Sequence, residues 1–133
     1  MTPLAHAIRT FAIGVVATLA LAIPALAGEL RPWDADGFAA AQAEGRPVVV
    51  HVTAPWCPTC RAQKPVVEQL LSDPATDDLI VFEVDFDSQK DVLRRFNIRS
   101  QSTLVAWRGT TETGRTVGDT RPDGIAALFT GTL

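Results

Sequence analysis

The chain has two cysteines, Cys57 and Cys60, and they lie three residues apart. If these residues open a helix, the spacing places Cys60 about one turn beyond Cys57 on the same face, where a disulfide can close a very small ring. A disulfide that stabilises a fold usually joins distant segments, because the entropy removed from the unfolded chain grows with loop length. This pair joins almost neighbouring residues. We therefore interpret it as a redox-active dithiol.

Two other interpretations of the cysteines stay open, namely half of a zinc site and a local structural clip. A zinc site usually has four ligands, and the chain offers only His6 and His51 besides the two cysteines. The sequence therefore does not easily supply a closed zinc site. We expect no metal and no cofactor in the resting protein.

The N-terminal segment has the composition of a secretory signal peptide. Residues 1–10 contain one basic residue, Arg9, and no acid; residues 11–23 are almost continuously apolar, and the small-residue site Ala25-Leu26-Ala27 follows. A membrane anchor needs roughly 20 apolar residues, which is longer than this run. We predict cleavage after Ala27, with one domain over residues 28–133. If the segment is not cleaved, it would tether that domain to a membrane.

Composition and compartment restrict the partners. Removal of residues 1–27 takes away one of the 12 basic residues and none of the 15 acidic ones, so the mature chain has a net charge of −4. Its basic residues are scattered, which argues against a nucleic-acid surface. We expect the exported domain in the periplasm, and outside the cytosol a dithiol stays reduced only if a partner reduces it. Export therefore implies an electron donor.

A buried strand and a helix are predicted on either side of the dithiol. Residues 48–53 are β-branched and apolar at nearly every position, which is typical of a central parallel strand covered on both faces. A loop over residues 54–56 leads to a helix over 57–71, whose core stripe we expect at Val66, Val67, Leu70 and Leu71. Pro65 lies inside this helix and should kink its axis.

The remaining elements complete an alternating pattern. A short segment from residue 30 to 36 precedes a helix over 38–44 that is capped by Asp34 or Asp36. Strands are predicted at 79–85, 103–107 and 115–117. Two further helices are predicted, one from Asp87 or Ser88 to about Phe96 and one over 125–130. The order β-α-β-α-β-α-β-β-α predicts a three-layer α/β fold, with a mixed central sheet and helices on both faces. Sites in such sheets gather at the carboxyl ends of the central strands, which here means residues 54–60.

The sequence over residues 30–133 resembles the thioredoxin family. The features that carry the resemblance are the valine-rich strand, Ala54-x-Trp56-Cys57-x-x-Cys60, Pro65 five residues later, Val84-Asp85, Ile98-Arg99-x-x-x-Thr103-Leu104 and Val117-Gly118. A single CxxC is a weak signal, whereas this set in this order is specific. The resemblance implies a thioredoxin-like fold and thiol–disulfide exchange. Exported reductants that work beside a membrane electron donor look most similar.

The position of the dithiol assigns its two sulfurs different tasks. At a helix N-terminus, Cys57 faces unpaired backbone N–H groups and the positive end of the helix dipole, which lower its pKa and favour the nucleophilic thiolate. Pro58 suits the first helical position. Cys60 lies one turn inward, is expected to be less exposed, and resolves the mixed disulfide. We interpret Trp56 as a shield and an apolar contact for substrates; the alternative is an aromatic residue at the rim of the core.

Three departures from the family pattern concern residues that tune the site. His51 stands where thioredoxins place a buried acid, and it could take the proton of Cys60; alternatively it is a core histidine bonded to backbone. We expect burial to keep it neutral at pH 7. Ser102, before Thr103, replaces the usual cis-proline, so we expect a trans peptide, a loop that contacts substrate, and sulfurs more open to metal ions. Pro58-Thr59 between the cysteines, without a histidine, predicts a less oxidising site than that of strong oxidants.

These observations predict an exported, monomeric protein-disulfide oxidoreductase. We expect Cys57 and Cys60 to reduce the disulfides of client proteins with electrons from an inner-membrane dithiol donor. The same pair could serve a thiol oxidase or isomerase, because the direction depends on reduction potential and partner. A metal-binding or metal-delivery module that uses Cys57 and Cys60 with Ser102 or a second subunit is the alternative from another class, and a purely structural disulfide is a third.

Overall fold

A computed structural model describes residues 27–133. The signal peptide predicted for residues 1–27 lies outside the described residues, apart from its last residue. In chain order the elements are β1 (Glu29–Pro32), α1 (Ala35–Ala43), β2 (Pro47–Thr53), α2 (Pro58–Leu71), the 3-10 turn η1 (Pro74–Thr76), β3 (Ile80–Asp85), α3 (Lys90–Arg95), β4 (Thr103–Arg108), β5 (Thr111–Val117) and α4 (Pro122–Thr130). This is the predicted order, and the mixed α/β architecture is confirmed.

Strand β2 lies at the centre of a five-stranded sheet with the order β1-β3-β2-β4-β5. It runs parallel to β3 and antiparallel to β4, with His51 opposite Glu83 on one side and Leu104 on the other. All seven residues of β2 are buried. The valine-rich run is therefore covered on both faces, as predicted, although only one of its two neighbours is parallel.

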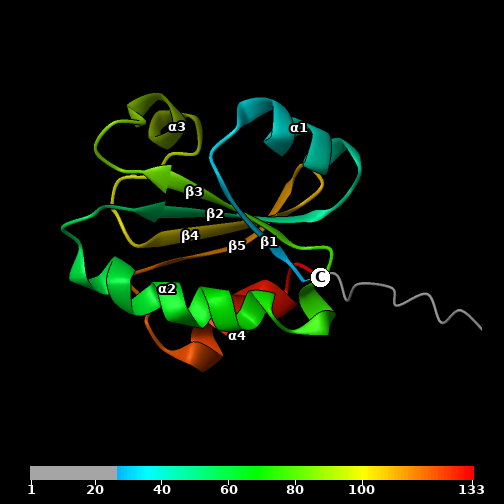
Figure 1. Cartoon of the computed structure of the whole chain (residues 1–133). Coiled ribbons are helices and arrows are strands. Elements are labelled where there is room, and N and C mark those ends of the chain that lie inside the picture. The colour runs from blue at the N-terminus through cyan, green and yellow to red at the C-terminus, as the bar shows by residue number, and fades with distance from the viewer. Residues whose placement is uncertain (1–26) are drawn as a thin grey trace, which may run out of the picture.

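Helices α1 and α3 cover one face of the sheet and α2 and α4 cover the other, so the molecule has three layers (Figure 1). Because side chains alternate along a strand, Val48, Val50 and Val52 contribute to the core under α1 and α3. Val49 contributes to the separate core under α2 and α4. His51 lies on the same face of β2 as Val49, and it is therefore beneath α2.

Helix α2 begins directly after Cys57 and continues through Pro65 to Leu71. Its fully buried residues are Cys60, Gln63, Val67 and Leu71, spaced three or four apart. Val66 and Leu70, which were expected in the core stripe, are only partly buried. The face that α2 turns to the sheet is therefore polar near the dithiol and apolar towards its end.

Two predicted helix starts differ in detail. Asp34 caps α1 through its carboxylate, as one of the two proposed candidates. Neither Asp87 nor Ser88 caps α3. The N-cap residue of this helix is Gln89, and its side chain makes no capping hydrogen bond. The carboxylate of Asp85 instead accepts the N–H groups of Asp87 and Ser88, so this turn is held from the end of β3. Within residues 27–133, none of the helices has the length and apolar character needed to cross a membrane.

Candidate functional site

The two cysteines lie at the N-terminus of α2 and form a disulfide, with their Cα atoms 5.3 Å apart. Cys57 is the N-cap residue, and its sulfur accepts the backbone N–H of Cys60 at 3.1 Å. Pro58 occupies the first turn, where its missing N–H costs no hydrogen bond. A sulfur at this position receives a backbone donor and the positive end of the helix dipole, both of which favour a thiolate.

The exposure of the two sulfurs differs from the prediction. Cys60 was expected to be the less exposed residue, yet both cysteines are 1% exposed. The Cys57 sulfur lies 4.0 Å from the hydroxyl oxygen of Ser102, and the Cys60 sulfur lies 4.0 Å from the carbonyl oxygen of Val52. The disulfide is thus held between the Ser102 loop and the end of β2. The difference between the sulfurs lies in the N–H bond that Cys57 alone accepts from the helix.

Ser102 lies in a tightly held loop beside Cys57. Residues 27–133 contain no cis peptide bond, so the predicted trans bond before Ser102 is confirmed. Ser102 has φ +53°, in the left-handed region that is unfavourable for residues other than glycine. Its N–H donates to Val52 at 2.8 Å, and its carbonyl accepts the N–H of Gly118 at 2.9 Å. These bonds hold the strained conformation next to the sulfur.

The other predicted site residues surround the disulfide at different depths. Thr103 is buried and its hydroxyl donates to the carbonyl of Ser100 at 2.7 Å, so its side chain is used within the loop. Thr59 is half-buried and Pro58 is exposed. Trp56 is 55% exposed, and its indole N–H donates to Asp87 at 2.7 Å. An apolar ring therefore stands on the surface next to the dithiol, outside the core clusters of the described residues.

His51 is buried beneath α2 and bonded to a side chain. It is 1% exposed, and its Nε2 lies 3.0 Å from Oε1 of Gln63. The alternative interpretation expected a hydrogen bond from His51 to a backbone group, whereas the observed partner is the side chain of Gln63. Burial lowers the pKa of His51 below its ordinary value of 6.5. The hydrogen bond to Gln63 and the charge of Glu83 oppose this shift in pKa, and the charge of Lys64 adds to it. The ring is neutral at pH 7, as expected.

Gln63 is the residue of the site that sequence reasoning missed. It is 0% exposed, and its amide nitrogen donates to the carbonyls of Ser102 at 3.1 Å and Asp119 at 2.8 Å. The signal was present in the sequence: Gln63 lies three residues after Cys60 and four before Val67, on the face that α2 buries. A polar residue in such a stripe indicates a buried network.

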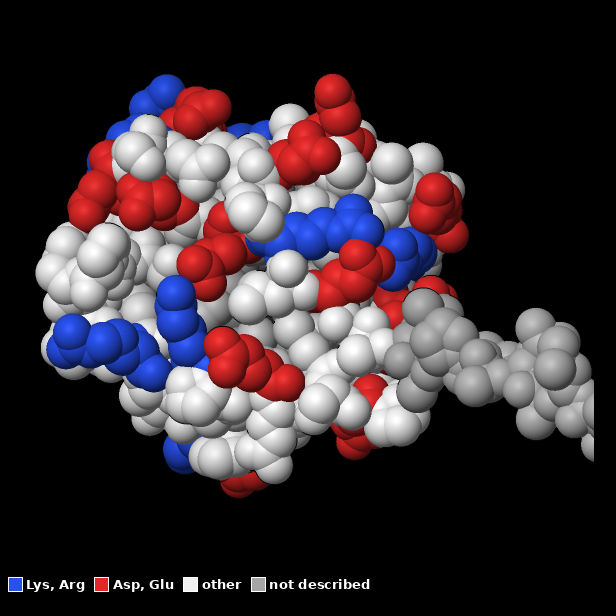
Figure 2. Space-filling view, in the orientation of Figure 1, with Lys and Arg blue, Asp and Glu red and all other residues white. Residues whose placement is uncertain are grey.

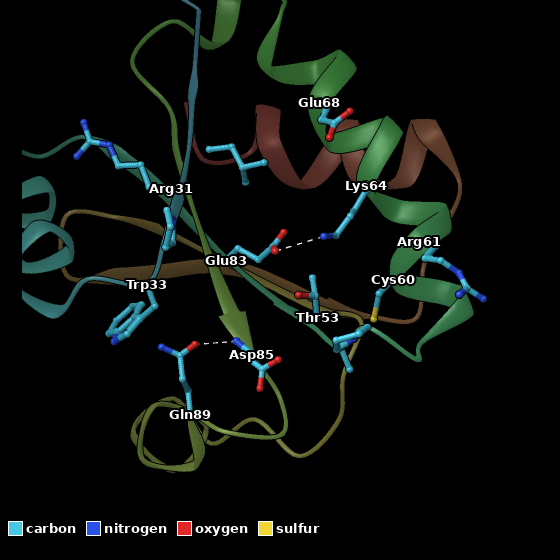
Figure 3. A pocket seen from close by; sticks show the side chains of 14 residues that line it. Arg31, Trp33, Thr53, Cys60, Arg61, Lys64, Glu68, Glu83, Asp85 and Gln89 are labelled. Atoms are coloured by element: carbon cyan, nitrogen blue, oxygen red, sulfur yellow. Dashed lines mark hydrogen bonds and ion pairs between the residues drawn. The ribbon is translucent and has the colours of Figure 1, made fainter.

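A pocket of about 690 Å³ opens between β1, β3 and the first half of α2, and Cys60 is among the residues that line it (Figure 3). Lys64 reaches across it to the carboxylate of Glu83 at 3.3 Å. Glu83 is in turn the β3 neighbour of His51. The pocket thus brings charged side chains, and a path for solvent, towards Cys60.

Charge is mixed around this opening. On the face in Figure 2, basic and acidic side chains alternate, without a large patch of one sign. Among residues 27–133, no group of three or more His, Cys, Asp or Glu side chains is arranged to hold a metal ion.

The fold and the site together define an α/β domain with a dithiol–disulfide pair at the end of its central strand. The thioredoxin family profile matches residues 33–130. The chain belongs to the thioredoxin family, and the protein is a disulfide oxidoreductase of that family.

Three relatives illustrate the similarity. Thioredoxin of Mycobacterium tuberculosis is 34% identical over 84 residues, which are 63% of this chain and 69% of that protein. A bifunctional thioredoxin reductase/thioredoxin of Mycobacterium leprae is 32% identical over 96 residues, 72% of this chain but only 20% of that protein. The crystal structure of Trxlp from Edwardsiella tarda superimposes with a TM-score of 0.73 at 40% identity, over 75% of this chain and 97% of that one.

Proposed function

We propose that the protein is exported to the periplasm and there reduces disulfides of client proteins, with electrons from an inner-membrane dithiol donor. The observation that carries the direction is the environment of the Cys57 sulfur. Within residues 27–133 it accepts one backbone N–H, and no charged side chain donates to it. A modestly stabilised thiolate makes the reduced form less favourable than it is in strong oxidants, and therefore a better electron donor.

The reaction runs through a mixed disulfide. The Cys57 thiolate attacks one sulfur of the client disulfide, and the other client sulfur leaves as a thiolate. Cys60 then loses its proton and attacks the Cys57 sulfur, which releases the second client thiol and forms the Cys57–Cys60 disulfide. The client gains two electrons, and the membrane donor returns two electrons to the pair. Trp56 offers the apolar contact for the client, and the Ser102 loop offers backbone groups and a hydroxyl.

His51 is the proton acceptor for Cys60 in this proposal. The ring is buried beneath the helix that carries Cys60, and its low pKa leaves it neutral and able to accept a proton. Glu83, its neighbour on β3, favours the imidazolium that would form.

The reduction potential of the Cys57–Cys60 couple against glutathione tests the direction. A value near the roughly −270 mV of thioredoxin supports a reductant, whereas a value near the roughly −180 mV of protein disulfide isomerase assigns an oxidase or isomerase. Fractionation of cells that express the full chain tests export, because a periplasmic product beginning at Gly28 is expected. Stoichiometric metal in protein purified under reducing conditions, without disulfide reductase activity, would replace this proposal by a metal-delivery role.

A further inference from the structure

Gln63 connects two parts of the site that the reaction uses. Its side chain is completely buried, on the face of α2 that also carries Cys60. It bonds to His51 on β2, to the carbonyl of Ser102 and to the carbonyl of Asp119. Three segments that are distant in sequence therefore meet at one amide group.

The two carbonyls fix the orientation of this amide. A carbonyl oxygen only accepts hydrogen bonds, so the NH2 group of Gln63 must face Ser102 and Asp119, at 3.1 and 2.8 Å. The amide oxygen must then face Nε2 of His51, at 3.0 Å. An amide oxygen cannot donate, and therefore the proton of this bond belongs to His51. The neutral ring carries a single proton, which leaves Nδ1 as the unprotonated nitrogen.

We propose that Gln63 is a positioning residue for thiol–disulfide exchange: it holds His51 as the Nε2–H tautomer, so that Nδ1 is the proton acceptor, and it fixes the carbonyl of the Ser102 loop beside Cys57. The first half rests on the role of His51 in the proposed function. The proton of the Cys60 thiol passes to Nδ1, directly or through a water molecule; the Cys60 sulfur bonds to the Cys57 sulfur, and the client sulfur leaves with the electron pair of the broken bond. The imidazolium then returns its proton to the client thiolate or to solvent.

Two charged groups and one apolar neighbour surround His51 and influence its protonation. The charged groups that act on it are Glu83 from β3, which favours the imidazolium, and Lys64 from α2, which opposes it. Leu104, its neighbour on β4, is apolar. A neutral amide at position 63 satisfies both carbonyls without adding a buried charge, which a glutamate could not do.

The tautomer is measured directly by nitrogen NMR of the full chain carrying His6→Gln, in which His51 is the only histidine. At pH 7.5 we expect a protonated Nε2 and an unprotonated Nδ1. A protonated Nδ1 in the otherwise unaltered protein would overturn the proposal, and this result needs no substitution in the buried network.

Kinetics of single-turnover resolution of the mixed disulfide test the consequence. Gln63→Met keeps the side-chain volume and removes all three hydrogen bonds. We expect His51 to become a mixture of tautomers and the resolution rate at pH 7 to fall about tenfold. This fall is smaller than the roughly 10²-fold or more that complete loss of general-base catalysis would cause. Gln63→Glu keeps an acceptor for His51, so we expect the Nε2–H tautomer to persist and the pH profile to shift to higher pH. Gln69→Met on the exposed side of the same helix is the matched control and should leave the tautomer and the resolution rate unchanged.

The outcomes separate this inference from the proposed function. An unchanged tautomer and pH profile in Gln63→Met would overturn the positioning role. If Gln63→Met does not fold, the tautomer in the unaltered protein and the profile of Gln63→Glu decide. A His51→Gln protein with an unaltered pH profile would instead remove His51 from the chemistry, while the tautomer measured by NMR would still establish what Gln63 holds in place.

Discussion

The two faces of the sheet are packed with different groups. Under α1 and α3, aromatic rings meet at centroid distances from 4.9 to 6.0 Å, and they belong to Trp33, Phe38, Phe82, Phe96 and Trp107. The guanidinium of Arg95 covers this cluster from outside, 5.2 Å from the ring of Phe96. This face buries large apolar area in edge-to-face and tilted contacts, which are favourable for aromatic pairs.

Under α2, the packing changes along the helix. Its second half rests on apolar residues such as Val49, Leu79 and Val81. Its first half, which carries Cys60, buries Gln63 against His51 of β2. The buried histidine and glutamine therefore lie at the end of the sheet where β2 meets the dithiol, while the opposite face supplies a cluster of aromatic rings.

Buried polar groups are tolerated here because they are paired. Among the described residues, no buried side-chain nitrogen or oxygen is left without a hydrogen-bond partner. An unpaired buried polar group costs about 1–3 kcal/mol, so a half-satisfied network would weaken a domain of this size noticeably. The comparison of the two faces therefore predicts that substitutions on one change stability and substitutions on the other change the chemistry.

Replacement of the nucleophile should give the largest effect. In Cys57→Ser, the attacking thiolate is lost and we expect disulfide reductase activity to fall by at least about 10³-fold, as for other removed nucleophiles. Cys60→Ser should instead accumulate the mixed disulfide with the client, because attack is retained and resolution is lost. Activity assays and intact-mass measurement of the trapped species check both. Trapping by Cys57→Ser in place of Cys60→Ser would reverse the assignment of the two sulfurs.

Loss of a ring from the opposite face should give the next largest effect, on stability alone. Phe38 is 1% exposed and packs against the four other rings of the cluster. Phe38→Ala should lower the free energy of unfolding by about 3–5 kcal/mol, measured by denaturant unfolding of the disulfide form. We expect no change in the reduction potential of the folded protein. A shift in that potential would show that the two faces are coupled.

Leu30→Ala provides the control for that measurement, since Leu30 is 44% exposed on the edge strand β1. Its free energy of unfolding should change by less than about 1 kcal/mol.

The sequence predicts the strands, the helices and the place of the dithiol because these follow from local patterns. The valine-rich strand, Pro58 after Cys57 and the capping Asp34 each act within a few residues. The left-handed conformation of Ser102 and the partners of Gln63 could not be predicted, because each is fixed by residues far away in the chain. Ser102 is held by Val52 and Gly118, whose positions only the sheet determines.

The exposure of the cysteines teaches the same lesson. The sequence places Cys57 at the start of the first turn of α2 and Cys60 at its end, which predicts different exposure. The Ser102 loop, however, contacts Cys57 although it lies 45 residues away in the chain. Local reasoning therefore identifies the pair and its helix, while the packing of the loop decides how far each sulfur is buried.

Acid should reveal the polar face through stability. Burial lowers the pKa of His51 in the folded protein, whereas the unfolded chain has the ordinary value of about 6.5. Between these two values the unfolded state binds more protons, so the free energy of unfolding should fall as the pH drops below about 6.5 and level off below the folded pKa. Each unit of difference corresponds to about 1.4 kcal/mol.

Urea unfolding of the unaltered protein and of His51→Leu, from pH 8 to pH 5, measures this effect. The substitution leaves the amide oxygen of Gln63 without its partner and should lower stability at every pH, so the informative quantity is the slope with pH. The slope between pH 6.5 and 5 should be smaller in His51→Leu. Parallel curves would mean that His51 binds protons equally in the folded and unfolded states.

The smallest effect is expected at the mouth of the pocket. Lys64 and Glu83 pair at 3.3 Å with side chains 45% and 30% exposed, so water screens their attraction. Lys64→Met should change the free energy of unfolding at pH 7 by less than about 1 kcal/mol, and 1 M salt should reduce that difference further. Removal of the cation should also raise the pKa of His51 towards its ordinary value, because Lys64 opposes the imidazolium. The acid-induced loss of stability should then be smaller than in the unaltered protein. A larger loss would mean that Lys64 does not lower the pKa of His51, and would contradict the assigned effect of this cation.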